Sequence, residues 1–158
     1  MNIQAIPKQF KLFLIVFLMI TACGSELKAQ IVVVVNPENP ISNLSMDDLK
    51  AIYSGKITSY ENGTKIVLTQ TKGHSAEFYE TVLRKSLNNV MKYWINLVFS
   101  GVSVTPPLEC RSEEEAIRTV FNNIGAIGFI ENSMIDERVK AITLNKIQAG
   151  KVGYPFEP

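Results

Sequence analysis

The sequence has 158 residues, of which 46% are hydrophobic and 20% charged, and its formal net charge is +1. This length suits one domain of ordinary size, and the composition is that of a folded protein rather than a disordered one. The near balance of 16 basic and 15 acidic residues argues against a nucleic-acid-binding protein. One histidine and two cysteines exclude most zinc and iron–sulfur sites, which need about four nitrogen or sulfur ligands. We therefore expect no metal and no cofactor.

The N-terminal segment has the pattern of an export signal. Lys8 and Lys11 precede an uninterrupted apolar run, which is too short for a transmembrane helix of about 20 residues. The run ends in Thr21-Ala22-Cys23-Gly24, which resembles the lipobox of bacterial lipoproteins. In that family the cysteine is acylated and the chain is cut just before it.

This pattern predicts a lipoprotein-type signal peptide over 1–22, lipidation of Cys23 and a short tether over 23–30. The alternative is ordinary cleavage near Ala29, which would give a soluble secreted protein. Either way the mature protein is exported, to the periplasm or the cell envelope. Loss of 1–22 removes two lysines and shifts the formal net charge from +1 to −1. With Cys23 lipidated, Cys110 has no partner for an internal disulfide.

The predicted domain begins with a buried strand over 31–35, where five β-branched residues follow one another as in strands covered on both faces. Ser45 has the position of an N-cap, with acids in the first turn after it, and Gly55 has that of a C-terminal stop. These residues predict a helix between them. Asn62-Gly63 then predicts a tight turn.

The second half continues the alternation of strands and helices. A strand over 65–69 leads into a polar loop over 70–75, two amphipathic helices follow, and strands are predicted over 125–130 and 139–144. The apolar faces of the helices are predicted at Phe78, Tyr79, Val82 and Leu83, at Val90, Tyr93, Trp94, Leu97 and Val98, and, after a capping box at Ser112–Glu115, at Ala116, Ile117, Val120 and Phe121.

This order of elements predicts an α/β fold, a three-layer sandwich in which helices flank a mixed β-sheet. We place the domain at 31–145 and a C-terminal tail at 146–158.

Three segments, in this order, resemble the PstS-type phosphate receptors of ABC importers. Leu49–Lys56 (LKAIYSGK) is similar to an L-x-x-I-F-x-G-K segment of that family, Gly125–Phe129 (GAIGF) is similar to its G-A-I-G-Y, and Tyr93-Trp94 with Phe99–Gly101 lies between them. A complete receptor has two lobes and a much longer chain. The resemblance therefore implies a single lobe of a type II periplasmic binding protein, with most of the mature chain included.

The loop Thr71-Lys72-Gly73-His74-Ser75, which leads into a helix, is the predicted anion-binding site. A helix N-terminus presents unpaired N–H groups and a partial positive charge. Gly73 would let the backbone approach an anion closely, and Ser75 would cap the helix or donate its hydroxyl. Lys72 and His74 would add positive charge.

The resemblance implies the same location, because the receptors bind phosphate at the equivalent strand-to-helix loop. It also implies weaker binding here, because Gln70 or Thr71 stands near the position of the receptors' arginine. A bidentate arginine is a strong phosphate ligand, so its loss should lower the affinity substantially.

The other reactive residue types give little reason to expect an enzyme. His74 is predicted to be solvated, because no third residue is evident to orient its imidazole beside Ser75. The acids at 113–115 are explained by helix capping and the helix dipole. Cys110 is predicted in a loop, where it could be a reactive thiol, but only Arg111 favours a lowered pKa.

The sequence thus predicts a non-catalytic, extracytoplasmic solute-binding domain for phosphate or a related small oxyanion. The alternative is a lipid-anchored interaction module that has lost its ligand and docks on a membrane-embedded or other envelope protein. Changes at His74 and Ser75 would impair the first protein and leave the second unaffected.

Overall fold

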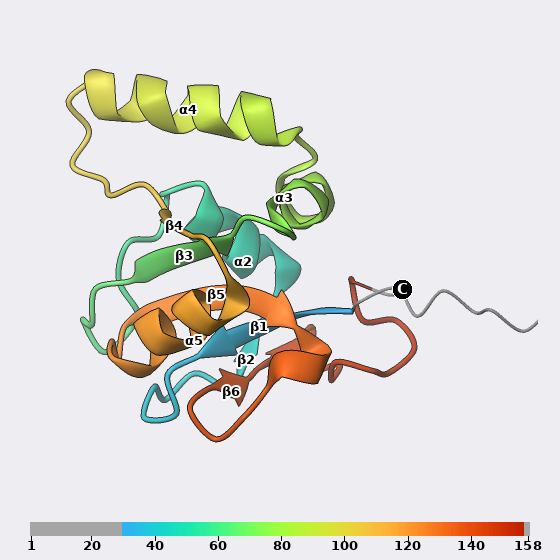
Figure 1. The fold of residues 1–158 in the computed structure, drawn as a ribbon. Helices are drawn as coiled ribbons and strands as arrows, with labels where there is room; N and C mark the ends of the chain where they lie inside the picture. Colours follow the sequence, from blue (N-terminus) through green and yellow to red (C-terminus); the bar gives the residue numbers. More distant parts are fainter. Residues whose placement is uncertain (1–29, 157–158) are drawn as a thin grey trace, which may run out of the picture.

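Five strands form one mixed sheet in a computed structural model, which describes residues 30–156 (Figure 1). The predicted signal peptide over 1–22 and the lipid anchor on Cys23 lie outside the described residues. The strand order is β4-β3-β5-β1-β6. The strands are β1 (Ile31–Val35), β3 (Val67–Thr71), β4 (Leu108–Cys110), β5 (Ala126–Glu131) and β6 (Lys140–Ala141).

Three neighbouring strands of this sheet, β4, β3 and β5, run parallel to one another. The first strand of the domain, β1, is antiparallel to both of its neighbours, β5 and β6, with Val33 opposite Phe129. A separate parallel pair is formed by β2 (Asn43–Leu44) and β7 (Thr143–Leu144). Because β4, β3 and β5 are parallel, their carboxyl ends lie together at one edge of the sheet.

Helices cover both faces of the sheet, which confirms the predicted three-layer α/β sandwich. They are α2 (Met46–Tyr53), α3 (Ser75–Leu83), α4 (Leu87–Phe99) and α5 (Glu113–Phe121), with a short 3-10 helix η1 (Asn132–Met134). The buried apolar residues form two core clusters. The first packs α2, α3 and α4 against one face of the sheet, and the second packs α5 against the other face. Figure 1 shows α4 beyond α3, at the outer end of the fold.

The strand β1 shows why its sequence has no polar alternation. All five residues are buried, and Ile31, Val33 and Val35 contact the first core cluster while Val32 and Val34 contact the second. The predicted N-cap is also confirmed, because Ser45 Oγ accepts a hydrogen bond from Asp48 N and Asp48 in turn accepts from Ser45 N.

Several predicted elements differ from the structure. The single strand over 139–144 is two short strands, β6 and β7, in different sheets, and the strand expected at 65–69 lies at 67–71. Val98 and Phe121, predicted to face inward, are exposed by 44% and 50%. Helical periodicity identifies an apolar face but not how much of it a neighbouring element covers.

Cys110 lies in β4 rather than in a loop and is only 2% exposed. Burial raises the pKa of its thiol. The thiol is therefore neutral and inaccessible, so the predicted loop position was wrong, and the structure gives no support for a reactive cysteine.

The chain beyond residue 145 contributes to the core. Tyr154 and Phe156 are 1% and 2% exposed, and Phe156 stacks on Phe78 with ring centroids 5.4 Å apart. The Tyr154 hydroxyl accepts a hydrogen bond from Val33 N at 3.3 Å. The boundary predicted at 145 thus separates two core residues from the domain that they stabilise.

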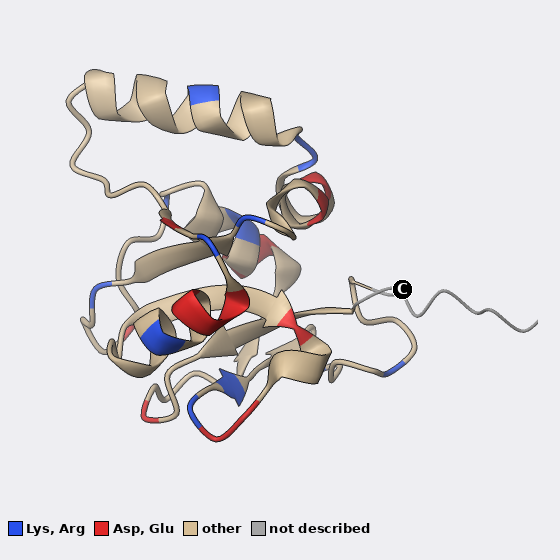
Figure 2. Ribbon diagram, in the orientation of Figure 1, with Lys and Arg blue, Asp and Glu red and all other residues tan. Residues whose placement is uncertain are grey.

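No helix within residues 30–156 is both long enough and apolar enough to cross a membrane. Basic and acidic residues are interspersed along the ribbon in Figure 2, without a face of one sign in that view.

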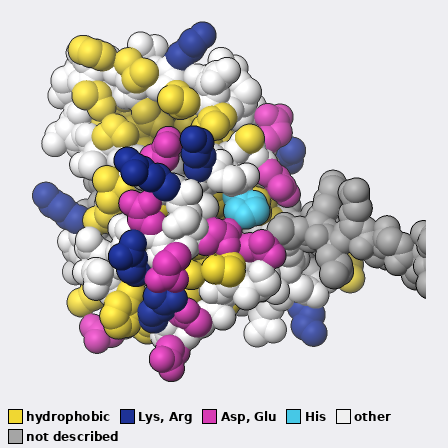
Figure 3. Space-filling model, viewed as in Figure 1, with side chains coloured by type: hydrophobic (Ala, Val, Ile, Leu, Met, Phe, Trp, Pro, Cys, Tyr) yellow, Lys and Arg dark blue, Asp and Glu magenta, His cyan; other side chains and the backbone are white. Residues whose placement is uncertain are grey.

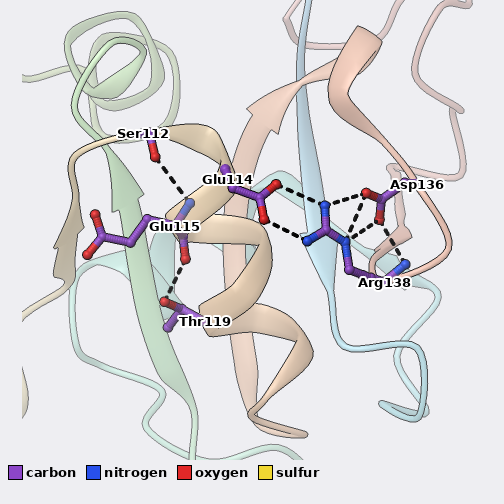
Figure 4. Close-up of polar contacts among 6 residues, drawn as sticks. All are labelled: Ser112, Glu114, Glu115, Thr119, Asp136 and Arg138. Carbon is purple, nitrogen blue, oxygen red and sulfur yellow. Dashed lines mark hydrogen bonds and ion pairs between the residues drawn. The ribbon is translucent and has the colours of Figure 1, made fainter.

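On the side of the sheet that α5 covers, the main ion-pair cluster links α5 to the loop after η1 (Figure 4). Arg138 donates to both carboxylate oxygens of Glu114, at 2.7 and 2.9 Å, and also to Asp136. These hydrogen bonds lower the pKa of the Glu114 and Asp136 carboxyls. Because the lowered pKa values belong to the folded state, the stabilisation is present at neutral pH and is lost as the pH falls through them.

The variant Arg138→Ala is therefore expected to raise both carboxyl pKa values toward those of free side chains, as measured by carbon NMR titration. It should change neutral-pH stability little, because all three groups are solvent-accessible. Unchanged titration curves in the variant would contradict the pairing.

Candidate functional site

The carboxyl ends of the three parallel strands meet at one edge of the sheet. There β3 leads through Lys72–His74 into α3, β4 leads into α5, and β5 leads into η1. In open α/β sheets ligands bind in the crevice outside the carboxyl ends of the strands. This edge is therefore the candidate site.

Two helix N-termini point at this edge. The first turns of α3 and α5 leave backbone N–H groups without intrahelical partners, and each helix contributes a partial positive charge. Ser112 caps α5 by accepting a hydrogen bond from Glu115 N at 3.2 Å. The N-cap of α3 is His74, whose side chain makes no capping hydrogen bond.

The two hydroxyls of the predicted loop are engaged within the protein. Thr71 is the last residue of β3, and its hydroxyl donates to Phe129 O at 2.8 Å. Ser75 is the first residue of α3 rather than its cap, and its hydroxyl donates to Thr71 O at 2.8 Å. Both residues are buried, so they shape the loop around the site.

Lys72 and Gly73, by contrast, are exposed. Lys72 N donates to Cys110 O at 3.1 Å, which fixes the loop to the end of β4. A Cβ atom at Gly73 would meet open space, and the backbone there is not left-handed. The loop thus leaves room for a ligand beside Gly73.

His74 contacts Glu113, the first residue of α5. Its Nε2 lies 2.9 Å from Glu113 Oε1, and the two side chains are only 19% and 16% exposed. In Figure 3 the single histidine borders acidic side chains. The prediction that His74 is solvated was therefore wrong. Glu113 does lie in the first turn of α5, as predicted, and it contacts His74 in addition.

A second acid completes this cluster. Glu131 ends β5, and its backbone N–H donates to Glu113 Oε1 at 2.8 Å. One ligand atom from each of His74, Glu113 and Glu131 lies within 4.8 Å of the others. Ser75 donates its hydroxyl to Thr71 O, so it forms no nucleophile pair with the imidazole.

The acids of this cluster had no distinctive signal in the sequence. Glu113 stands in a run of three glutamates of which Glu114 pairs with Arg138 and Glu115 accepts from Arg111 N. Only the meeting of β3, β4 and β5 brings Glu113 and Glu131 to His74. Gln70, near the expected arginine position, instead accepts a hydrogen bond from Tyr79 at 2.6 Å.

Three further hollows lie elsewhere. A groove of about 340 Å³ along α4 is lined mainly by apolar side chains, including Trp94 and Phe99, and has no charged group. A pocket of about 350 Å³ includes Lys65 and lies at the amino end of β3, opposite the candidate site. A third, of about 460 Å³, lies between α2, the end of α3 and α4, and its lining includes Asp47, Lys50, Lys56 and Lys85. None of them combines charged groups with the strand ends at which α/β proteins bind ligands.

No protein-family model matches the chain, and no curated protein matches its sequence. Solved structures do match. An ABC-type phosphate transport receptor from Vibrio cholerae has a TM-score of 0.61 and 26% identity over 76% of this chain and 48% of its own.

Two further solved structures match at lower identity. A putative phosphate ABC transporter substrate-binding protein with bound phosphate from Clostridium perfringens has a TM-score of 0.60 and 20% identity, over 76% of this chain and 46% of its own. PstS from Borrelia burgdorferi has a TM-score of 0.54 and 17% identity, over 74% and 47%. The chain thus spans about half the length of the proteins it matches. Its fold is that of one lobe of phosphate-binding periplasmic proteins.

Proposed function

We propose that this chain is a non-catalytic, extracytoplasmic solute-binding domain that binds phosphate or a related small oxyanion at the carboxyl ends of β3, β4 and β5. The main supporting observation is the position of Glu113. Its carboxylate is held between the Glu131 backbone N–H and the His74 imidazole. These donors therefore hold an anionic group, which in this structure is the carboxylate of Glu113 itself.

The proposed anion-binding residues are Thr71, Lys72, Gly73, His74 and Ser75. Lys72 supplies positive charge, and the open space beside Gly73 admits the ligand. The first backbone N–H groups of α3 add unpaired donors. Thr71 and Ser75 hold the loop in shape through their buried hydrogen bonds.

The likeness to phosphate receptors supports a binding role over an enzymatic one, because the matched structures are named as transport receptors or binding proteins. It also favours binding over the alternative of an interaction module without a ligand. We further propose that the protein is exported and anchored to the cell envelope through lipidated Cys23, where an ABC transporter or another envelope protein is its partner.

Binding of phosphate alone is expected to be weak. The chain spans about half of each receptor that it matches, and one lobe leaves the ligand open to water. Glu113 and Glu131 also repel a dianion, since two charges 4 Å apart interact by roughly 1–4 kcal/mol at a protein surface. A dissociation constant on the order of micromolar to millimolar follows.

Removing one of these charges should strengthen binding. The variant Glu113→Gln is expected to bind phosphate about tenfold more tightly, which corresponds to about 1.4 kcal/mol. The measurement is calorimetry of the full chain in detergent, with EDTA present and with phosphate, sulfate and acetate as ligands. Glu114→Gln is the matched control, because Glu114 follows directly in α5 but pairs with Arg138. No heat and no thermal shift with any of these anions, in either variant, would exclude the proposed function.

A further inference from the structure

The charges at the strand ends do not balance. Two carboxylates, Glu113 and Glu131, lie beside one imidazole, and two helix N-termini add roughly half a positive charge each. The two carboxylates and the two helix N-termini together therefore carry a net charge of about −1. Lys72 and Arg111 are exposed, so water screens much of their charge. An edge of this kind attracts a cation, and without one it binds an anion only weakly.

The three side chains also have suitable geometry for a metal ion. His74 Nε2 and Glu113 Oε1 are 2.9 Å apart, and a ligand atom of Glu131 lies within 4.8 Å of both. Around a tetrahedral ion with bonds of about 2.0–2.2 Å, neighbouring ligand atoms are about 3.3–3.5 Å apart. Movements of about 1 Å, within the reach of side-chain rotation, would bring all three atoms into contact with one ion. Binding would also displace the Nε2 proton that now points at Glu113, to Nδ1 or to water.

The surrounding structure orients these groups. The Glu131 backbone N–H donates to Glu113, and Ser133 Oγ donates to Glu131 Oε1 at 2.6 Å. Hydrogen bonds of this type fix the orientation of metal ligands. The three residues come from the loop before α3, the start of α5 and the end of β5, so the fold holds them together.

We propose that His74, Glu113 and Glu131 bind a divalent transition-metal ion of the zinc class. A ligand set with an imidazole selects such ions over magnesium and calcium, which prefer oxygen ligands alone. The shortage of histidines and cysteines does not exclude such a site, because carboxylates replace the missing nitrogen and sulfur ligands.

Three protein ligands leave one tetrahedral position open. If the proposed oxyanion function also holds, that position takes a phosphate oxygen, and the ion supplies the positive charge that an arginine would otherwise provide. This second step rests on the proposed function, whereas the metal site itself does not.

The test uses the full chain in detergent, purified without a polyhistidine tag and treated with chelator. Calorimetry with zinc chloride is expected to give one ion per chain, and magnesium chloride to give no comparable binding. The variants His74→Ala, Glu113→Gln and Glu131→Gln should each weaken zinc binding by at least tenfold. Glu114→Gln should leave it unchanged, and thermal unfolding without zinc checks that each variant folds.

The single histidine provides a direct readout. Zinc should shift the Nε2 nitrogen resonance of His74, which a structural role alone would not do. Absence of zinc binding, or affinity unchanged in His74→Ala and Glu131→Gln, would overturn the metal site.

Phosphate titrations with and without zinc separate the two proposals. Tighter phosphate binding in the presence of zinc supports both. Zinc binding with no phosphate binding under any condition keeps the metal site and rejects the oxyanion function. Glu113→Gln should act in opposite directions, strengthening phosphate binding in EDTA while weakening zinc binding.

Discussion

The variant Gly125→Ala is expected to destabilise the protein by about 3 kcal/mol, a large fraction of the roughly 5–15 kcal/mol that stabilises an ordinary domain. Gly125 directly precedes β5, and a Cβ atom there would overlap the backbone carbonyl oxygen of Lys65. A backbone oxygen cannot rotate away as a side chain can. The ends of β3 and β5 would have to separate, although Val67 N now donates to Gly125 O at 3.0 Å.

Urea unfolding followed by circular dichroism measures this change. The matched control is Gly73→Ala, because a Cβ atom at Gly73 meets open space and the backbone there suits an ordinary residue. We expect its stability to match that of the wild type within about 0.5 kcal/mol. Equal unfolding midpoints for the two alanine variants would show that β3 and β5 do not approach as closely as described.

The variant Phe156→Ala is expected to cost about 3–5 kcal/mol, the usual penalty for removing a buried aromatic ring. Phe156 is 2% exposed and stacks on Phe78 at an interplanar angle of 8°. Phe78 in turn stacks on Phe129 of β5, with ring centroids 3.8 Å apart. The ring of Phe156 thus completes a stack that begins on the central sheet.

Thermal unfolding provides the measurement for this variant as well. Val152→Ala is the control, because Val152 is 96% exposed and lies in the same C-terminal segment. We expect no measurable change for it. A small effect of Phe156→Ala would instead support the boundary predicted from the sequence, with 146–158 as a tail that the domain does not need.

The elements with strong local signals were predicted well. The five β-branched residues of β1 and the N-cap at Ser45 identify their elements without help from the rest of the chain. In contrast, β4 has three residues, two of them exposed, and is a strand because it pairs with β3. Local sequence does not encode such pairing, which depends on partners far along the chain.

The residues of the candidate site also fall into those that the sequence predicts and those that it does not. The loop from Thr71 to Ser75 could be found because polar residues and a glycine stand between a strand and a helix. Glu113 and Glu131 could not, because each has an ordinary local explanation, at a helix start and at a strand end. Their role as neighbours of His74 depends on strand order, which the sequence did not reveal.

The position of β1 bears on how the chain folds. This strand lies between β5 and β6, so the first strand of the domain pairs only with segments near its end. The sheet cannot close until residue 141 is available, and such long-range pairing slows folding. We therefore expect the emerging polypeptide to stay unfolded until this residue has been synthesised. That delay would suit the proposed export, in which the protein would pass through a secretion channel as an extended chain.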